Sequence, residues 1–143
     1  MTLKIVRMPK KRVHEGLKDG SIDFYPGASF DKDRASYMMW INNGFETREV
    51  CLTANTIANI TDLSKAGSLT ILAELGGSKS KINEKFPNIT VSHVENMGID
   101  KVLNLFKSGR GNLFILDIEE VDYFKKKNGA DVFEKNGAKV HMD

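Results

Sequence analysis

The sequence predicts an α/β protein with a mostly parallel sheet that is covered on both faces. Strand and helix signals alternate along the chain with short connections between them, and parallel strands need crossover helices of this kind. Hydrophobic residues make up 41% of the chain and charged residues 28%, which is typical of a globular protein. The 143 residues suffice for one ordinary domain or for two small lobes.

The first third of the chain carries short apolar runs and one helical pattern. Val13 and Leu17 lie four residues apart on one face of a helix expected over residues 10–18, which ends at an Asp-Gly pair. Asp31 is expected to cap a short helix that runs to Met38 or to the residue after it. Strands are expected over residues 3–7, 22–25 and 49–53.

From residue 61 onward the alternation restarts with stronger signals. The best helix in the chain has apolar residues at positions i, i+3, i+4 and i+7, and a Lys-Ser-Gly sequence ends it. These apolar residues are Ile99, Val102, Leu103 and Phe106. Further helices are expected over residues 78–85 and 118–127, and strands over residues 68–73, 89–94, 113–116 and 138–142.

Composition argues against several classes of site. A net charge of +2 gives no basic field that would require nucleic acid. Cys51, the single cysteine, cannot form an internal disulfide or a multi-cysteine metal site, and its apolar neighbours predict an inert buried thiol. The three histidines lack metal-ligand spacing. We therefore expect no metal, no cofactor and no nucleic-acid partner.

Three groups of polar residues follow predicted strands, where open parallel sheets bind ligands. Arg34 follows the second strand, a Gly-Gly-Ser-Lys loop at residues 76–79 follows the strand 68–73, and Asp117 ends the strand 113–116. Each also has a purely structural reading. Arg34 can pair with Asp31, the glycines can form a simple turn, and Asp117 can cap the next helix. Together, however, a cation, exposed amides and a carboxylate match a zwitterion.

Several segments resemble the family-3 extracellular solute-binding proteins, the amino-acid-binding components of bacterial ABC transporters. The first is RVHEGLKDGSIDFYPGASFDKDRASYMMW, which is similar to the family's Leu-x-x-Gly-x-Ile-Asp helix ending and Gly-x-Ser-x-Thr-x-x-Arg loop. The others are ITDLSKAGSLTILAELGGSKS and VLNLFKSGRGNLFILDIEEVDYF. The order and spacing of these segments extend the resemblance over nearly the whole chain.

The resemblance implies a type II periplasmic-binding-protein fold, in which two α/β lobes close over a ligand. Arg34 would bind the α-carboxylate of an amino-acid-like ligand, assisted by Ser29 and Phe30. The loop of the second lobe would offer amides or hydroxyls to the same carboxylate, and Asp117 would take the α-ammonium group. The loop residues are Gly77, Ser78 and Lys79.

The chain departs from the family pattern in two respects. Asp31 replaces the family's threonine or serine, so it cannot donate to a ligand carboxylate and can compete for Arg34. The chain is also shorter than family members and is interpreted as truncated at both ends. We expect residues 1–53 to form part of the first lobe, residues 54–59 to form a hinge connection and residues 60–143 to form most of the second lobe.

The resemblance therefore implies a protein that is not an enzyme and that binds a small polar, amino-acid-like solute in a cleft between the lobes, for delivery to an ABC transporter permease. The resemblance implies a periplasmic or extracellular location, with a signal peptide removed or lost from this chain. Two alternatives remain, namely the ligand-sensing domain of a membrane-anchored signalling protein and a dehydratase of cyclic acids on the same fold. A lobe too incomplete to bind any ligand is a further possibility.

Overall fold

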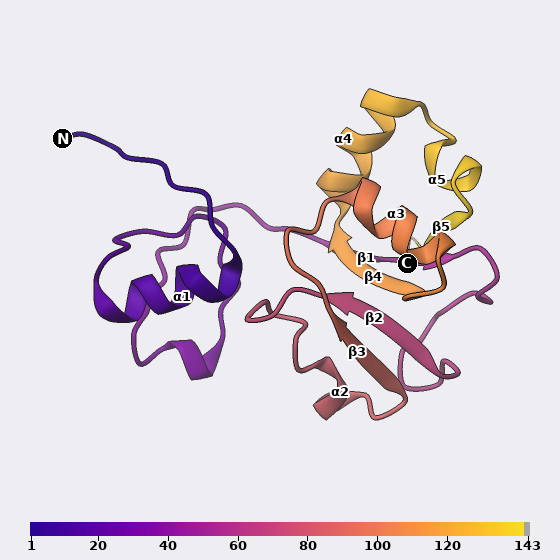
Figure 1. Ribbon diagram of the computed structural model, residues 1–143, viewed down its shortest axis with the longest axis horizontal. Helices are drawn as coiled ribbons and strands as arrows, with labels where there is room; N and C mark the ends of the chain where they lie inside the picture. The colour runs from indigo at the N-terminus through magenta and orange to yellow at the C-terminus, as the bar shows by residue number, and fades with distance from the viewer. Residues whose placement is uncertain (142–143) are drawn as a thin grey trace.

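The computed structural model describes residues 1–141 as an N-terminal part that lies beside a five-stranded sheet with its helices (Figure 1). The strands follow the order β3-β2-β4-β1-β5. Strands β2, β3 and β4 are mutually parallel, whereas β1 is antiparallel to both β4 and β5. Four strands therefore share one direction and β1 opposes them, which confirms the predicted mostly parallel α/β sheet.

The elements of the sheet region follow the predicted alternation closely. The strands are β1 (Glu49–Ala54), β2 (Leu69–Ala73), β3 (Ile89–His93), β4 (Leu113–Asp117) and β5 (Ala138–His141). The helices are α2 (Ile82–Lys85), α3 (Ile99–Lys107), α4 (Ile118–Asn128) and α5 (Val132–Lys135). The last residue of the strand expected over 138–142 lies outside the described residues.

Both faces of the sheet are covered, because successive residues of each strand point to opposite sides. On one side, Leu52, Leu72 and Leu116 pack with helices α3, α4 and α5 into the larger core. On the other side, Ile71 and Leu113 pack with α2 and with the segment that precedes β2. No helix within residues 1–141 combines the length and the apolar character that a membrane crossing requires.

The N-terminal part contains helix α1 (Lys10–Asp19), which confirms the helix expected over residues 10–18. His14 is buried at its centre, where its ring meets Tyr25 and Tyr37 edge-on and its Nδ1 lies 3.2 Å from Tyr37 Oη. Gly20 ends the helix in the left-handed conformation, at a φ of 78°. These contacts hold the surrounding loops on the helix.

Two strands expected in the N-terminal part are absent there. Residues 3–7 and 22–25 form no regular element, and no strand of the sheet pairs with them. A β-ladder needs a second segment at hydrogen-bonding distance, which the local apolar pattern does not supply. Several apolar side chains of the N-terminal part and of the connection to the sheet are exposed: Leu3, Ile5, Phe24, Met39, Ile41 and Phe45.

Strand β1 belongs to the sheet, although the expected division placed residues 49–53 at the end of the first lobe. Its residues pair in register with β4 from Glu49–Asp117 to Thr53–Leu113, and with β5 on the other side. The chain has no helix or strand from residue 38 to residue 48, where it crosses from the N-terminal part to the sheet (Figure 1). The division into two lobes stays a prediction, and this pairing moves the expected connection to before residue 49.

Three further elements differ in extent from the sequence-based expectation. The helix expected over residues 78–85 is regular only as α2, and turns precede it. The short helix expected after Asp31 is a single 3-10 turn, Lys32–Arg34, which Asp31 does cap by accepting a bond from the Asp33 N–H. Helix α5 was not expected, because four residues are too few to show a helical period.

Candidate functional site

Strand β1 and the parallel strands deliver polar residues to one edge of the sheet. Asp117 ends β4, and the register sets it opposite Glu49, the first residue of β1. The loop at residues 74–79 follows β2, which is parallel to β4. The start of β1 reaches the same edge as the ends of β2 and β4 because β1 runs in the opposite direction. This edge faces the N-terminal part of the chain (Figure 1).

A cavity of about 540 Å³ lies at this edge, and residues from both parts of the molecule line it. The N-terminal part contributes Ser29, Phe30 and Asp31, and the loop after β2 contributes Ser78 and Lys79. The structure thus brings together five of the eight residues predicted for the site. The remaining lining residues come from the segment that leads into β1 and were not predicted: Thr47, Arg48 and Glu49.

Arg34 does not line this cavity, because its guanidinium group contacts the loop after β2. Its Nη2 donates a hydrogen bond of 3.0 Å to the Gly76 carbonyl, and its Nε lies 3.6 Å from Asp31 Oδ2. The Arg34 side chain is only 12% exposed. Asp31 therefore both caps the 3-10 turn and pairs with Arg34. These two contacts engage part of the guanidinium, which carries five N–H donors in all.

The loop after β2 offers backbone N–H groups beside the cavity. Gly77 and Ser80 use their N–H groups in turn bonds, to the carbonyls of Glu74 and Gly77. Within residues 1–141, no hydrogen bond uses the N–H of Ser78 or Lys79, and both residues line the cavity. Adjacent unpaired N–H groups in a turn form a favourable place for an anionic group.

Asp117 lies at the same edge but lines neither this cavity nor the smaller one described below. It occupies the N-cap position of α4, and its N–H donates to Glu120 Oε2 over 3.2 Å. Burial raises the pKa of the Asp117 carboxyl above its usual value of 3.8, and the negative charges of Glu49 and Glu119 raise it further. A cation placed among these three carboxylates would be attracted to all of them.

Lys79 carries a positive charge close to Asp117, but its ammonium group already forms an ion pair with Glu49. Lys79 Nζ lies 2.8 Å from Glu49 Oε2, so this lysine and this glutamate largely neutralise one another. Lys79 lowers the pKa of Asp117, but less than burial and the two glutamates raise it. The predicted role of Lys79 therefore rests on its backbone N–H rather than on its ammonium group.

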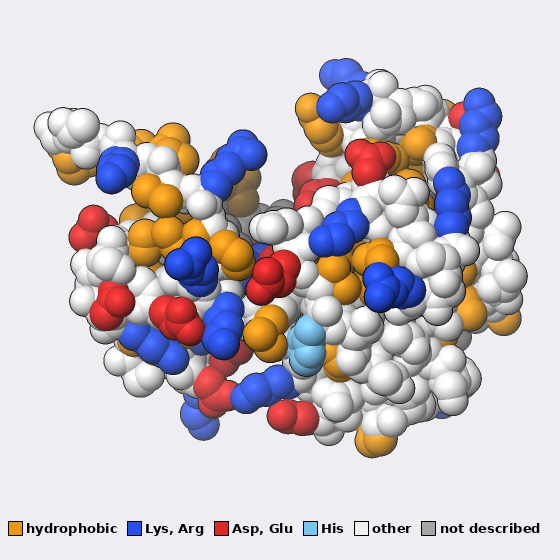
Figure 2. All heavy atoms as spheres, in the orientation of Figure 1, with side chains coloured by type: hydrophobic (Ala, Val, Ile, Leu, Met, Phe, Trp, Pro, Cys, Tyr) orange, Lys and Arg blue, Asp and Glu red, His pale blue; other side chains and the backbone are white. Residues whose placement is uncertain are grey.

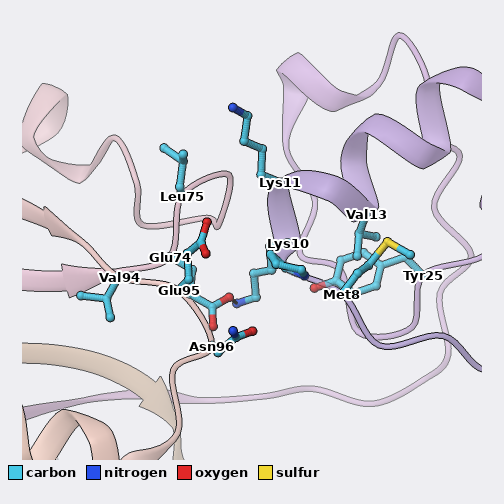
Figure 3. Close-up of a pocket in the computed structure, with 11 residues that line it drawn as sticks. Met8, Lys10, Lys11, Val13, Tyr25, Glu74, Leu75, Val94, Glu95 and Asn96 are labelled. Atoms are coloured by element: carbon cyan, nitrogen blue, oxygen red, sulfur yellow. Dashed lines mark ion pairs between the residues drawn. The ribbon is translucent and has the colours of Figure 1, made fainter.

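A second, smaller cavity of about 250 Å³ lies between the start of α1 and the loops that follow β2 and β3 (Figure 3). An ion pair of 3.2 Å between Lys10 Nζ and Glu74 Oε2 crosses it. None of its residues was among the predicted site residues. They include Tyr25, Leu75, Glu95 and Asn96, which come from three separate segments.

Close packing joins the two parts of the molecule between the cavities. A Cβ atom on Gly76 would lie 3.2 Å from Lys11 Cα, and the φ of Gly76 is +80°, so a glycine suits both the contact and the backbone. Charged side chains of both signs intermix across this junction (Figure 2). Within residues 1–141, no group of His, Cys, Asp and Glu side chains could hold a metal ion.

Solved structures of amino-acid-binding proteins share this fold. An ancestral arginine-binding protein bound to arginine is 18% identical, with a TM-score of 0.75 over 96% of this chain and 60% of that chain. The arginine-bound form of truncated ArgBP from T. maritima is 16% identical, with a TM-score of 0.73 over 98% of this chain and 63% of that chain. Streptococcus pneumoniae AbpA, an amino acid ABC transporter substrate-binding protein bound to L-arginine, is 12% identical, with a TM-score of 0.74 over 96% of this chain and 56% of that chain.

These likenesses confirm the predicted periplasmic-binding-protein-like fold. The chain spans about 60% of the length of the structures it matches, which confirms that it is shorter than they are. No family model and no curated protein matches the sequence.

Proposed function

We propose that this chain is part of a family-3 solute-binding protein, which binds a small amino-acid-like molecule between its N-terminal part and its sheet. The observation that carries the proposal is the cavity of about 540 Å³, which residues from both parts line. Its volume lies within the usual range for small-molecule sites, roughly 300–1,000 Å³. The fold shared with amino-acid-binding proteins supports the same function.

The α-carboxylate of the ligand would bind at the loop after β2. The Ser78 and Lys79 N–H groups are available there, and the Arg34 guanidinium, which keeps further donors, contacts the same loop at the Gly76 carbonyl. A guanidinium group and backbone amides are strong donors to a carboxylate. The α-ammonium would bind at Asp117, where Glu119 adds negative potential.

Binding between the two parts would favour the arrangement in which they touch. The Lys10–Glu74 ion pair and the Arg34–Gly76 hydrogen bond already link them. A ligand with contacts to both parts adds free energy only to this arrangement, so it shifts the population toward it. The closed form would then deliver the solute to an ABC transporter permease, at the outer side of the membrane. No catalytic step is assigned to the site.

A thermal-shift screen of the 143-residue chain against the standard L-amino acids tests this function. A ligand at 100 times its dissociation constant stabilises a protein by about 2.7 kcal/mol, which gives a readily measured rise in Tm. We expect at least one amino acid to raise Tm, and isothermal titration calorimetry to show one site per chain. A folded chain whose Tm no amino acid changes at millimolar concentration would refute the proposal.

Replacing Asp117 with asparagine is expected to weaken amino-acid binding and yet to stabilise the free protein at neutral pH. The asparagine cannot neutralise an ammonium group, so affinity should fall by roughly tenfold or more. Because the pKa of Asp117 is raised in the folded state, its ionised form opposes folding at a pH above that pKa. Asparagine removes this cost and still caps α4, so we expect Tm at pH 7 to rise.

The pH dependence and a matched variant separate these effects. The Tm advantage of Asp117→Asn should shrink as the pH falls through the folded-state pKa of Asp117, because the wild-type carboxyl then becomes neutral as well. Asp122→Asn makes the same charge change on an exposed position of α4 and should alter neither affinity nor Tm appreciably. An Asp117→Asn variant with unchanged affinity would remove Asp117 from the site.

A further inference from the structure

Asp31 is the acidic residue of the large cavity whose ion pair is the weaker one, although the Glu49 side chain is somewhat more exposed, at 46%. The Asp31 side chain is 36% exposed and lines the cavity, and its distance of 3.6 Å from Arg34 Nε is long for an ion pair. Glu49 also lines the cavity, but the contact of 2.8 Å with Lys79 already neutralises it. Asp117 does not line the cavity. Asp31 is therefore the carboxylate best placed to meet a cationic group inside it.

Phe30 adds an aromatic surface next to this carboxylate. The ring lines the same cavity and is 73% exposed. Trp40 supports it edge-on, with 5.0 Å between the ring centroids. A ring face beside a carboxylate favours ammonium or guanidinium groups, because the electrostatic attraction of the ring adds to that of the charge. Such a pair does not favour a neutral amide or an aliphatic end to the same degree.

We infer that Asp31 and Phe30 form a subsite for a second cationic group, so that the protein selects dibasic amino acids over neutral ones. The inference rests on the proposed function and adds the class of the ligand to it. The α-carboxylate and α-ammonium keep the places proposed above, on the loop after β2 and at Asp117. The side-chain cation lies in the large cavity and meets Asp31, which lines it together with Ser78 and Lys79.

The ion pair between Asp31 and Arg34 increases the expected preference for dibasic over neutral amino acids. With a neutral ligand, Asp31 holds Nε of Arg34 and competes with the ligand carboxylate for the guanidinium. A side-chain cation satisfies Asp31 and so leaves Arg34 freer to bind the carboxylate. The two ends of a dibasic ligand therefore assist one another, whereas a neutral ligand gains nothing from Asp31.

Calorimetry with L-arginine and L-glutamine tests this selectivity in the 143-residue chain. We expect the wild type to bind L-arginine at least ~10-fold more tightly than L-glutamine. Asp31→Asn should weaken L-arginine binding by roughly tenfold and leave L-glutamine binding unchanged or tighter, since Arg34 is released. The asparagine oxygen still accepts the Asp33 N–H bond of 2.9 Å that caps the 3-10 turn, so the loop should keep its shape.

Matched variants control for charge and for the fold. Asp33→Asn makes the same charge change two residues away, on an exposed side chain outside the cavity, and should leave both affinities unchanged. Phe30→Leu tests the subsite without altering any charge and should weaken L-arginine binding selectively. Phe24→Leu, at a similarly exposed ring that does not line the cavity, should have no effect.

The outcomes distinguish the inference from the function on which it rests. A wild type that binds L-glutamine but not L-arginine would keep the proposed function and overturn the cationic subsite. Equal losses of both ligands in Asp31→Asn would also overturn it, because Asp31 would then bind the α-ammonium that all amino acids share. A chain that binds no amino acid would refute the proposed function itself.

Discussion

Replacing Arg34 with alanine is expected to weaken amino-acid binding by roughly tenfold or more, because a ligand carboxylate would lose its guanidinium partner. The same change removes the hydrogen bond to the Gly76 carbonyl, which links the N-terminal part to the loop after β2. Loss of one such hydrogen bond costs about 0.5–1.5 kcal/mol of stability. Calorimetry should therefore show a larger effect on binding than chemical denaturation shows on folding.

Two variants sharpen this test. Arg34→Lys keeps the positive charge but loses the planar fork, so it should recover only part of the affinity. Arg12→Ala removes an exposed arginine from α1 and should leave binding unchanged. If Arg34→Ala binds amino acids as tightly as the wild type, then Arg34 serves only to hold Gly76 and Asp31, and the carboxylate depends on the Ser78 and Lys79 amides alone.

Replacing Phe133 with alanine should be the most destabilising single change considered for the sheet region. Phe133 is fully buried in the larger core, and its ring centroid lies 5.4 Å from that of Phe124. Removal of a buried phenylalanine ring costs about 3–5 kcal/mol, through lost apolar burial and the cavity left behind. Unfolding followed by circular dichroism should show a Tm lower by roughly 10 °C.

Phe24→Ala provides the matched control, because this ring is 67% exposed in the N-terminal part. The same truncation at such a position should change the free energy of unfolding by less than about 0.5 kcal/mol. Similar losses of stability in both variants would mean that the buried face of α5 contributes less to the core than its packing indicates.

The sheet region was predictable because each of its elements carries its own signal. Residues such as Val102, Leu103 and Phe106 repeat at the helical period and are all buried in the structure. Strands β2 and β4 are short apolar runs that end at polar residues, so the sequence also predicts which edge of the sheet would meet a ligand. In the structure, Ser78, Lys79 and the loop around Asp31 line one cavity, and their role in ligand binding stays a prediction.

The sequence could not show that β1 runs antiparallel to its neighbours, so the cavity-lining residues at its start were not predicted. Thr47 and Arg48 precede a strand and Glu49 begins it, whereas ligand groups were expected among residues that follow strands. Because β1 pairs antiparallel with β4, the start of β1, rather than its end, lies at the edge where the parallel strands end. The apolar runs at residues 3–7 and 22–25 misled for a related reason, since a strand exists only where a second segment pairs with it.

The sequence by itself determined the α/β class, the helices and strands of the sheet region, and the groups that could bind a zwitterion. It left open whether Asp31 caps a turn or pairs with Arg34. The tertiary structure decided that it does both, and that Arg34 also reaches Gly76, 42 residues further along the chain. Local patterns record the period and polarity of each segment, whereas the partners of a charged side chain depend on which distant segments the packed core brings beside it.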